Sequence, residues 1–167
     1  MILDRFKLTD KVVIVTGAGK GIGRGIALAF AEAGADIVCA ARTKDDIEDT
    51  AAEVRARGRS ALAVPTDVLK TEDLEELVAA TVSEFGRIDV VVNNAGGTGP
   101  RAALETSEGY FERALRMNVT QVFLLSKLAI PVMVETAAGG SIVNDRQSRV
   151  RGKRVDPVGR LLLTTHK

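Results

Sequence analysis

Short runs of apolar and β-branched residues recur along the chain, and glycine or polar residues follow most of them. Continuous apolar runs are typical of strands buried on both faces, because a strand with one solvent face alternates apolar and polar positions. The pattern predicts five strands, at residues 11–16, 36–41, 60–64, 88–92 and 141–144.

Between these runs, the apolar positions recur at intervals of three and four, the spacing of one helix face. Helices are predicted over residues 22–34, 43–58 and 74–85, followed by a longer one over about 109–135. Thr43, with Asp46 three residues later, resembles a capping pair that opens the second helix. The long helix is expected to gather its apolar residues on roughly one face: Phe111, Ala114, Leu115, Val119, Val122, Ile130 and Met133.

This unbroken alternation of strands and helices defines the fold class. Strand, helix, strand units of this length imply parallel strands joined by right-handed crossovers. The sequence therefore predicts an α/β, Rossmann-like, doubly wound parallel sheet with helices on both sides.

Composition narrows the class of protein further. A chain of 167 residues with 46% hydrophobic content suits one domain, and a net charge of +1 argues against a nucleic-acid partner. Cys39, the single cysteine, cannot form an internal disulfide, and charged N-terminal residues argue against a secretory signal, so we expect a cytoplasmic protein. The apolar region Val122–Val134 is interrupted by Lys127 and Pro131, so no membrane span is expected.

The charge is unevenly distributed between two parts of the chain. Residues 1–144 carry 16 basic and 20 acidic side chains, a balance of −4, whereas residues 145–167 carry 7 and 2, a balance of +5. We therefore expect one folded domain over residues 1–144 and an atypical basic tail over residues 145–167.

A glycine-rich segment, Thr16-Gly17-Ala18-Gly19-Lys20-Gly21-Ile22-Gly23, lies between the first predicted strand and the first predicted helix. Backbone N–H groups and the helix dipole at such a point can bind a pyrophosphate, and glycine allows the close approach. This placement favours a dinucleotide site over a simple tight turn.

The end of the second strand bears on which dinucleotide would bind. A carboxylate is expected there to bind the adenosine ribose hydroxyls of NAD, but this chain has Ala41-Arg42. Arg42, with Lys20 in the glycine turn, could instead pair with a 2′-phosphate. The pattern favours NADP(H) over NAD(H), and the alternative is that both cations are ordinary solvated charges.

Four motifs in order resemble those of the short-chain dehydrogenase/reductase family. They are the glycine segment of residues 16–23, Asp67-Val68, Asn93-Asn94-Ala95-Gly96 and Asn118-Val119. The resemblance covers roughly residues 8–144 and points to members such as 3-oxoacyl-(acyl carrier protein) reductases and hydroxysteroid dehydrogenases, which it does not separate. It implies the strand order 3-2-1-4-5, a small carbonyl or secondary alcohol as substrate, and assembly as a homo-oligomer.

The resemblance also assigns roles to individual residues. Asp67 and Val68 would bracket the adenine, and Asn118 would hold a water in a proton relay, unless it is a buried structural asparagine. The family also implies phosphate contacts from Gly17, Gly21, Ile22 and Gly23, and contacts to the nucleoside and nicotinamide ribose from Asn94, Ala95 and Gly96.

The catalytic serine, tyrosine and lysine of the family have no clear counterparts in this chain. The single tyrosine, Tyr110, is followed four residues later by Ala114 and precedes Asn118, so we interpret it as a surface or packing residue. Ser148 stands one position late for the serine. Arg160 and Thr164 stand where the tyrosine and lysine are expected.

These departures leave several readings open. We hypothesise that residues 145–167 reflect a frameshifted or misspliced reading, which an unbroken frame in the coding DNA supported by transcript would exclude. The alternative is a basic tail for an acidic partner. The resemblance implies the function of an NADP(H)-dependent oxidoreductase, and the missing catalytic residues lead us to expect weak or no activity from this chain. Two other hypotheses remain. The chain is a dinucleotide-binding or interaction module without catalysis, or it is a fragment that does not fold stably.

Overall fold

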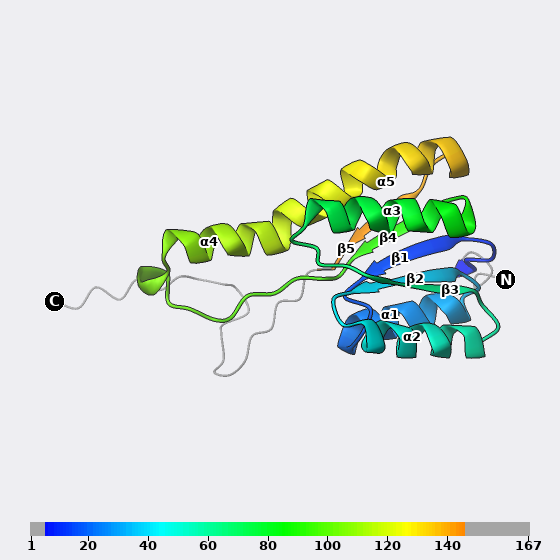
Figure 1. Cartoon of the computed structure of the whole chain (residues 1–167), viewed down its shortest axis with the longest axis horizontal. Helices are drawn as coiled ribbons and strands as arrows, with labels where there is room; N and C mark the ends of the chain where they lie inside the picture. The colour runs from blue at the N-terminus through cyan, green and yellow to red at the C-terminus, as the bar shows by residue number, and fades with distance from the viewer. Residues whose placement is uncertain (1–5, 146–167) are drawn as a thin grey trace.

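A computed structural model describes residues 6–145 of the chain. Strands and helices alternate along most of this region (Figure 1). The elements are β1 (Val12–Thr16), α1 (Gly21–Glu32), β2 (Asp36–Ala41), α2 (Lys44–Ala56), β3 (Ala61–Pro65), α3 (Thr71–Phe85), β4 (Val90–Asn93), the 3-10 turn η2 (Ala103–Glu105), α4 (Glu108–Leu115), the π-helical turn η3 (Arg116–Thr120), α5 (Gln121–Ala137) and β5 (Ser141–Asn144).

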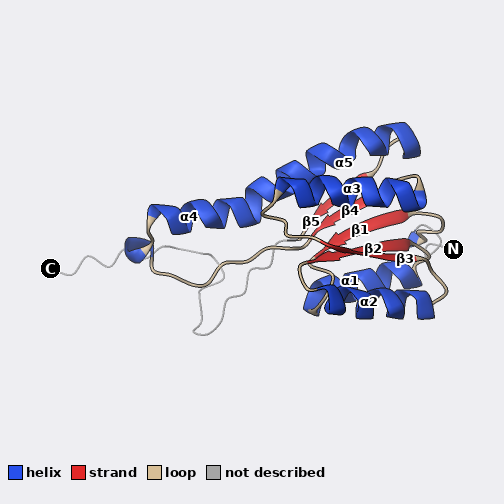
Figure 2. Ribbon diagram, viewed as in Figure 1, coloured by secondary structure: helices blue, strands red, loops and turns tan. Residues whose placement is uncertain are grey.

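The five strands form one parallel sheet in the order β3-β2-β1-β4-β5, as predicted. Helices α1 and α2 cover one face of the sheet, and α3 and α5 cover the other (Figure 2). The strand and helix bounds agree with the predicted ranges to within a few residues, and β2 and β5 agree fully.

The core lies in two layers, one on each side of the sheet, and β1 contributes to both. Val13 and Val15 pack on the side of α1 and α2, whereas Val12 and Ile14 pack on the side of α3 and α5. All five residues of β1 are buried, which confirms that its continuous apolar run indicates a strand covered on both faces.

The long helical region differs from its prediction. The expected apolar face is buried only in part, because Met133 is buried but Phe111, Leu115, Val119 and Ile130 are exposed. The buried residues of α5 recur every four positions: Gln121, Leu125, Ala129 and Met133. Phe111 and Leu115 are exposed because α4 extends past the end of the sheet (Figure 1), so no sheet lies beneath it, and a π-helical turn lies between α4 and α5.

The same region bears on the membrane prediction. Helix α4, the π turn and α5 form one continuous helical segment, Glu108–Ala137, which is long and apolar enough to cross a membrane by length and composition alone. It is longer than the apolar region Val122–Val134 considered from the sequence. A helix that packs along a sheet passes the same test, so this property is only weak support for a membrane span.

At the amino ends of β1 and β4, a buried carboxylate links the two strands. Asp89 accepts hydrogen bonds from Arg87 Nε and Nη2, both at 2.7 Å, and from Lys11 Nζ at 2.9 Å. It also accepts one from the backbone N–H of Val12 at 3.0 Å. This network lies at the end of the sheet opposite to the glycine turn, and we therefore assign it to stability.

Candidate functional site

The glycine turn follows the carboxyl end of β1, at the point where the strand order reverses. From β1 the chain proceeds outward through β2 and β3 on one side, while β4 and β5 lie on the other side. In open α/β sheets the ligand crevice forms at this switch point, outside the carboxyl ends of the strands. The fold therefore brings the ends of β1, β2 and β4 together as one candidate site.

Glycine is required at specific positions of the turn. Gly17 and Gly21 have positive φ angles of 68° and 56°. A Cβ on Gly23 would lie 2.1 Å from the carbonyl oxygen of Gly17, so no side chain fits between the turn and α1. The N-cap residue of α1, Lys20, makes no side-chain capping bond. The backbone N–H groups at the amino end of this helix therefore have no side-chain acceptor from Lys20.

Thr16 and Asn94 hold the glycine turn against the end of β4. The fully buried Thr16 hydroxyl accepts hydrogen bonds from the backbone N–H groups of Asn94 and Ala95, both at 3.0 Å. The Asn94 Nδ2 donates to the Thr16 carbonyl at 2.8 Å. Thr16, which we expected among the cofactor-binding residues, therefore lies beneath the turn and supports its shape.

A cavity of about 250 Å³ opens beside the glycine turn, between the ends of β2, β3 and β4. Its charged lining residues are Lys20, Arg42, Asp46 and Asp67. It brings together seven of the predicted cofactor-binding residues: Gly17, Lys20, Arg42, Asp67, Val68, Ala95 and Gly96. Gly21, Ile22 and Gly23 lie outside this lining, at the start of α1. We name this space the adenosine-side cavity, after the part of a dinucleotide that the switch point would place there.

The predicted capping pair at the start of α2 is not formed. Thr43 is the N-cap residue but makes no side-chain capping bond. Asp46 instead forms an ion pair with Lys20 of the glycine turn, with 3.0 Å between Nζ and Oδ2. The local pattern was misleading because a cation from another part of the chain competes for the Asp46 carboxylate.

The Asp67-Val68 segment is fixed by hydrogen bonds to its neighbours. Asp67 Oδ1 accepts from the N–H of Leu69 at 3.0 Å, and its own N–H donates to Asp73 Oδ2 at 2.8 Å. Arg116 from the π turn donates to the carbonyl of Leu69 at 2.9 Å. Val68 is buried at the wall of the cavity, where a flat apolar ring could pack against it.

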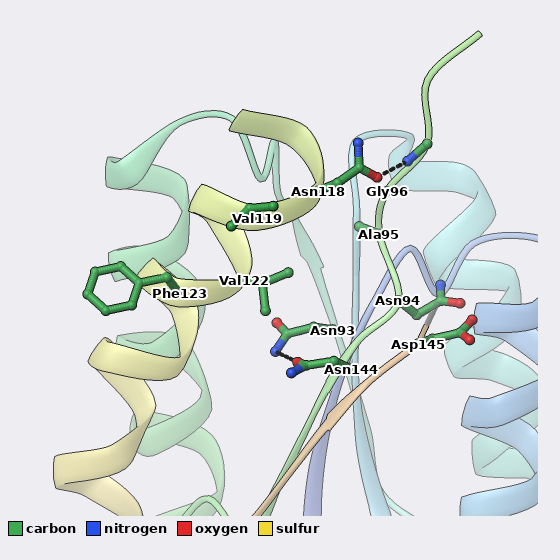
Figure 3. Close-up of a pocket in the computed structure, with 11 residues that line it drawn as sticks. Asn93, Asn94, Ala95, Gly96, Asn118, Val119, Val122, Phe123, Asn144 and Asp145 are labelled. Atoms are coloured by element: carbon green, nitrogen blue, oxygen red, sulfur yellow. Dashed lines mark hydrogen bonds between the residues drawn. The ribbon is translucent and has the colours of Figure 1, made fainter. Parts of the chain in front are cut away.

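A larger cavity of about 770 Å³ also borders the Asn94-Ala95-Gly96 segment (Figure 3). It is lined by residues from the end of β4, the region around the π turn and the end of β5. Asn118 projects toward it from the π turn. The Asn118 Oδ1 accepts from the N–H of Gly97 at 2.8 Å, and its Nδ2 donates to the carbonyl of Ala114 at 2.9 Å. Asn118 is exposed rather than buried, and its amide ties the helix to the loop after β4.

Two further amide side chains lie close to this cavity. Asn93 belongs to a motif quoted in the sequence analysis but received no role there, and Gln121 was not singled out from the sequence. The Asn93 Nδ2 donates to Asn144 Oδ1 at 2.9 Å and so connects β4 to β5. The fully buried Gln121 Nε2 donates to the carbonyl of Ala95 at 2.8 Å and to that of Met117 at 3.2 Å. Gln121 therefore links Ala95, which lines both cavities, to Met117, which lines the smaller one.

The remaining candidates for chemistry lie elsewhere. The Tyr110 hydroxyl donates to the carbonyl of Gly99, and Arg101 stacks on the Tyr110 ring at 4.5 Å from its centroid. Burial raises the pKa of the Cys39 thiol to about 12, which makes it a poor nucleophile. Within residues 6–145, no group of three or more His, Cys, Asp or Glu side chains could hold a metal ion. Ser148, Arg160 and Thr164 lie outside the described residues, as does most of the predicted basic tail.

Some lining residues have no obvious sequence signal. Phe123 and Val122 reach the larger cavity because the helix continues past the π turn, and Met117 reaches the smaller one from that turn. Asn144 and Asp145 line the larger cavity because β5 pairs with β4. Their positions follow from the strand order, which a local pattern does not encode.

The parallel sheet, its strand order and the crevice at its switch point are those of a Rossmann-like α/β domain. The model of the short chain dehydrogenase family matches residues 11–146, and the chain belongs to that family.

Known relatives extend this comparison. The chain is 44% identical to an uncharacterized oxidoreductase of Mycobacterium tuberculosis (strain CDC 1551 / Oshkosh) over 144 residues, which cover 86% of this chain and 55% of the relative. A crystal structure of a short-chain type dehydrogenase/reductase from Mycobacterium marinum has a TM-score of 0.82 and 38% identity, covering 86% of this chain and 58% of that one.

A third comparison includes bound ligands. The structure of a 7α-hydroxysteroid dehydrogenase complexed with NADH and 7-oxo glycochenodeoxycholic acid has a TM-score of 0.83 and 34% identity, covering 93% of this chain and 60% of that one. This chain therefore spans little more than half the length of these relatives.

Proposed function

We propose that this protein is an NADP(H)-dependent oxidoreductase that transfers a hydride between the nicotinamide and the carbonyl or secondary alcohol group of a small molecule. The family is one of oxidoreductases, and the structure of one relative is a complex with NADH and 7-oxo glycochenodeoxycholic acid. The preference for NADP(H), the substrate class and a cytoplasmic location are our proposals for this chain.

One observation carries the cofactor preference. Strand β2 ends at Ala41, which lines the adenosine-side cavity in the position where a carboxylate would bind the ribose hydroxyls of NAD. The next residue, Arg42, is exposed and lines the same cavity. A guanidinium at this point favours a 2′-phosphate, because it offers two parallel hydrogen bonds and a full positive charge.

The cofactor would supply the hydride chemistry, and this chain's residues would bind and orient it. The start of α1, with Gly17, Gly21, Ile22 and Gly23, would hold the phosphates. Asp67 and Val68 would face the adenine. The segment Asn94–Gly96 would lie along the nucleoside, between the two cavities.

The proton transfer that accompanies hydride transfer has no clear provider among residues 6–145, which the structure describes. The hydroxyl of Tyr110 donates to the carbonyl of Gly99, and neither residue lines either of the two cavities described above. Asn118 borders the larger cavity, and we propose that it positions a water there. We therefore expect weak turnover from this chain by itself. The placement of Tyr110 equally favours the second candidate, a dinucleotide-binding module without catalysis.

Titration calorimetry on the 167-residue chain tests the proposed cofactor. We expect NADPH to bind more tightly than NADH, and Arg42→Ala to remove most of that difference. Lys44→Ala is the matched control, because Lys44 is an exposed cation two residues away that does not line the cavity. Equal affinity for the two dinucleotides in the wild type would contradict the NADP(H) preference.

A turnover assay separates the two candidate functions. A catalyst consumes NADPH in the presence of a ketone, whereas a binding module shows saturable binding without consumption. A panel of steroid and sugar-acid ketones at saturating NADPH provides this test, with heat-denatured protein as the blank.

A further inference from the structure

Asp46 is an acidic residue inside the site that we propose to bind the 2′-phosphate of NADP(H). It lies in the first turn of α2, and its side chain is only 24% exposed. Its Oδ2 lies 3.0 Å from Lys20 Nζ, and both residues line the adenosine-side cavity. One of the two cations assigned to a 2′-phosphate is therefore already paired.

The position of Asp46 is fixed by its contacts with the glycine turn. The buried Thr50 hydroxyl lies 3.1 Å from the carbonyl of Asp46 and 3.0 Å from that of Ala18, so it links α2 to the turn. A Cβ on Gly19 would lie 2.8 Å from the Cβ of Asp46. The start of α2 thus packs directly against the glycine turn, which leaves the carboxylate little room to withdraw from the cavity.

The charges that line the cavity balance each other. Lys20 and Arg42 are basic, whereas Asp46 and Asp67 are acidic, so the formal charge of the lining is zero. Asp67 Oδ1 is engaged by the N–H of Leu69, while Asp46 faces the cation of the glycine turn. An incoming 2′-phosphate carries close to two negative charges, so this balance matters far more for NADP(H) than for NAD(H).

We propose that Asp46 is a specificity-determining residue that limits the preference of this site for NADP(H) over NAD(H). This inference rests on the proposed dinucleotide function. The carboxylate holds Lys20 in an ion pair that a 2′-phosphate must break or share, and it adds a like charge near that phosphate. A ribose 2′-hydroxyl experiences neither effect, because it is uncharged.

Neutral variants of Asp46 test this inference by calorimetry with NADPH and NADH. We expect Asp46→Asn to tighten NADPH binding by about fivefold, the upper range for an exposed ion pair, and to change NADH binding less than about twofold. Asp45→Asn is the matched control, because it removes the same charge from the same helical turn outside the cavity. Asp46→Ser repeats the test with a smaller side chain, should the asparagine variant fold poorly.

A salt series distinguishes an electrostatic role from a structural one. The gain in NADPH affinity of Asp46→Asn should shrink as the ionic strength rises, because salt screens interactions between exposed charges. A change that came only from altered packing would be insensitive to salt and would affect NADH equally.

The outcomes separate this inference from the proposed function. A rise in the ratio of NADPH to NADH affinity in both Asp46 variants, but not in Asp45→Asn, supports the inference even if the wild type prefers NADH. An unchanged ratio, or an equal rise in Asp45→Asn, overturns the inference while a wild-type preference for NADPH still supports the proposed function. Absence of dinucleotide binding in every variant overturns both.

Discussion

Removal of the Asp89 carboxylate should destabilise the sheet without touching the candidate site. Asp89 is buried and receives four hydrogen bonds, from Arg87, Lys11 and the N–H of Val12. Asp89→Ala leaves the Val12 N–H without that acceptor at the amino end of the central strand. The network lies at the amino ends of β1 and β4, whereas the cavities lie at the carboxyl ends.

The size of the effect follows from these contacts. A buried N–H without its acceptor costs about 1–3 kcal/mol. The side chains of Arg87 and Lys11 are 34% and 43% exposed, so each ion pair adds only about 0.5 kcal/mol after solvent screening. We therefore expect Asp89→Ala to lower the free energy of unfolding by about 2–4 kcal/mol.

Urea denaturation followed by circular dichroism measures this loss. Glu32→Gln is the control, because it removes only the exposed ion pair with Arg57, and it should cost less than about 1 kcal/mol. A loss below about 1 kcal/mol for Asp89→Ala would refute the reasoning, since Asp89 would then contribute no more than an exposed pair.

The same carboxylate predicts a dependence on pH. Burial by itself raises the pKa of Asp89, but the hydrogen bonds from Arg87, Val12 and Lys11 outweigh it and lower the pKa below 3.8. A lowered folded-state pKa stabilises the fold above the unfolded-state value, and the contribution is lost as the pH falls through the folded-state pKa. The stability difference between the wild type and Asp89→Asn should be constant near neutral pH and shrink below pH 3.8.

Three further predictions concern the turn, the core and the link between the cavities. Gly23→Ala should abolish saturable NADPH binding in calorimetry, because its Cβ would lie 2.1 Å from the Gly17 carbonyl oxygen, and retained binding would contradict the described turn. Cys39 should react with a thiol reagent at pH 8 only as fast as the protein unfolds, because burial raises its pKa to about 12; rapid labelling of the folded protein would contradict its burial. Gln121→Leu should lower the free energy of unfolding in urea by about 0.5–1.5 kcal/mol, because the carbonyls of Ala95 and Met117 lose a donor, and an unchanged stability would show that these hydrogen bonds do not stabilise the fold.

The sheet could be predicted from the sequence because each strand carries its own signal. Strand β2 has the predicted bounds because its run begins shortly after the turn at Gly34, whose φ is 105°, and ends before the polar residues that follow Ala41. The glycine turn could be recognised for a similar reason, because the steric demand at Gly23 acts on neighbouring residues of the same segment. The bounds of β2 and the shape of the glycine turn therefore depend mainly on residues that are close together in the sequence.

Other features depend on contacts between distant segments, which the sequence pattern does not reveal. The first part of the predicted apolar face of the long helix was wrong because α4 extends beyond the sheet, which leaves Phe111 and Leu115 exposed, whereas Met133 near the end of α5 is buried. Asp46 was misassigned to a capping pair because Lys20 is its partner in space. Gln121 gave no signal, because its partner Ala95 lies 26 residues away in the chain.

A dinucleotide titration followed by amide NMR on the 167-residue chain tests the central claim most directly. We expect NADPH to shift the N–H signals of Gly17, Gly21, Gly23, Gly96 and Arg42. NADH should shift the Arg42 signal less than NADPH does, because it has no 2′-phosphate. Signals near Asp89, at the opposite end of the sheet, should stay unchanged. Shifts confined to other parts of the chain, or no shifts at saturating NADPH, would contradict a dinucleotide site at the glycine turn.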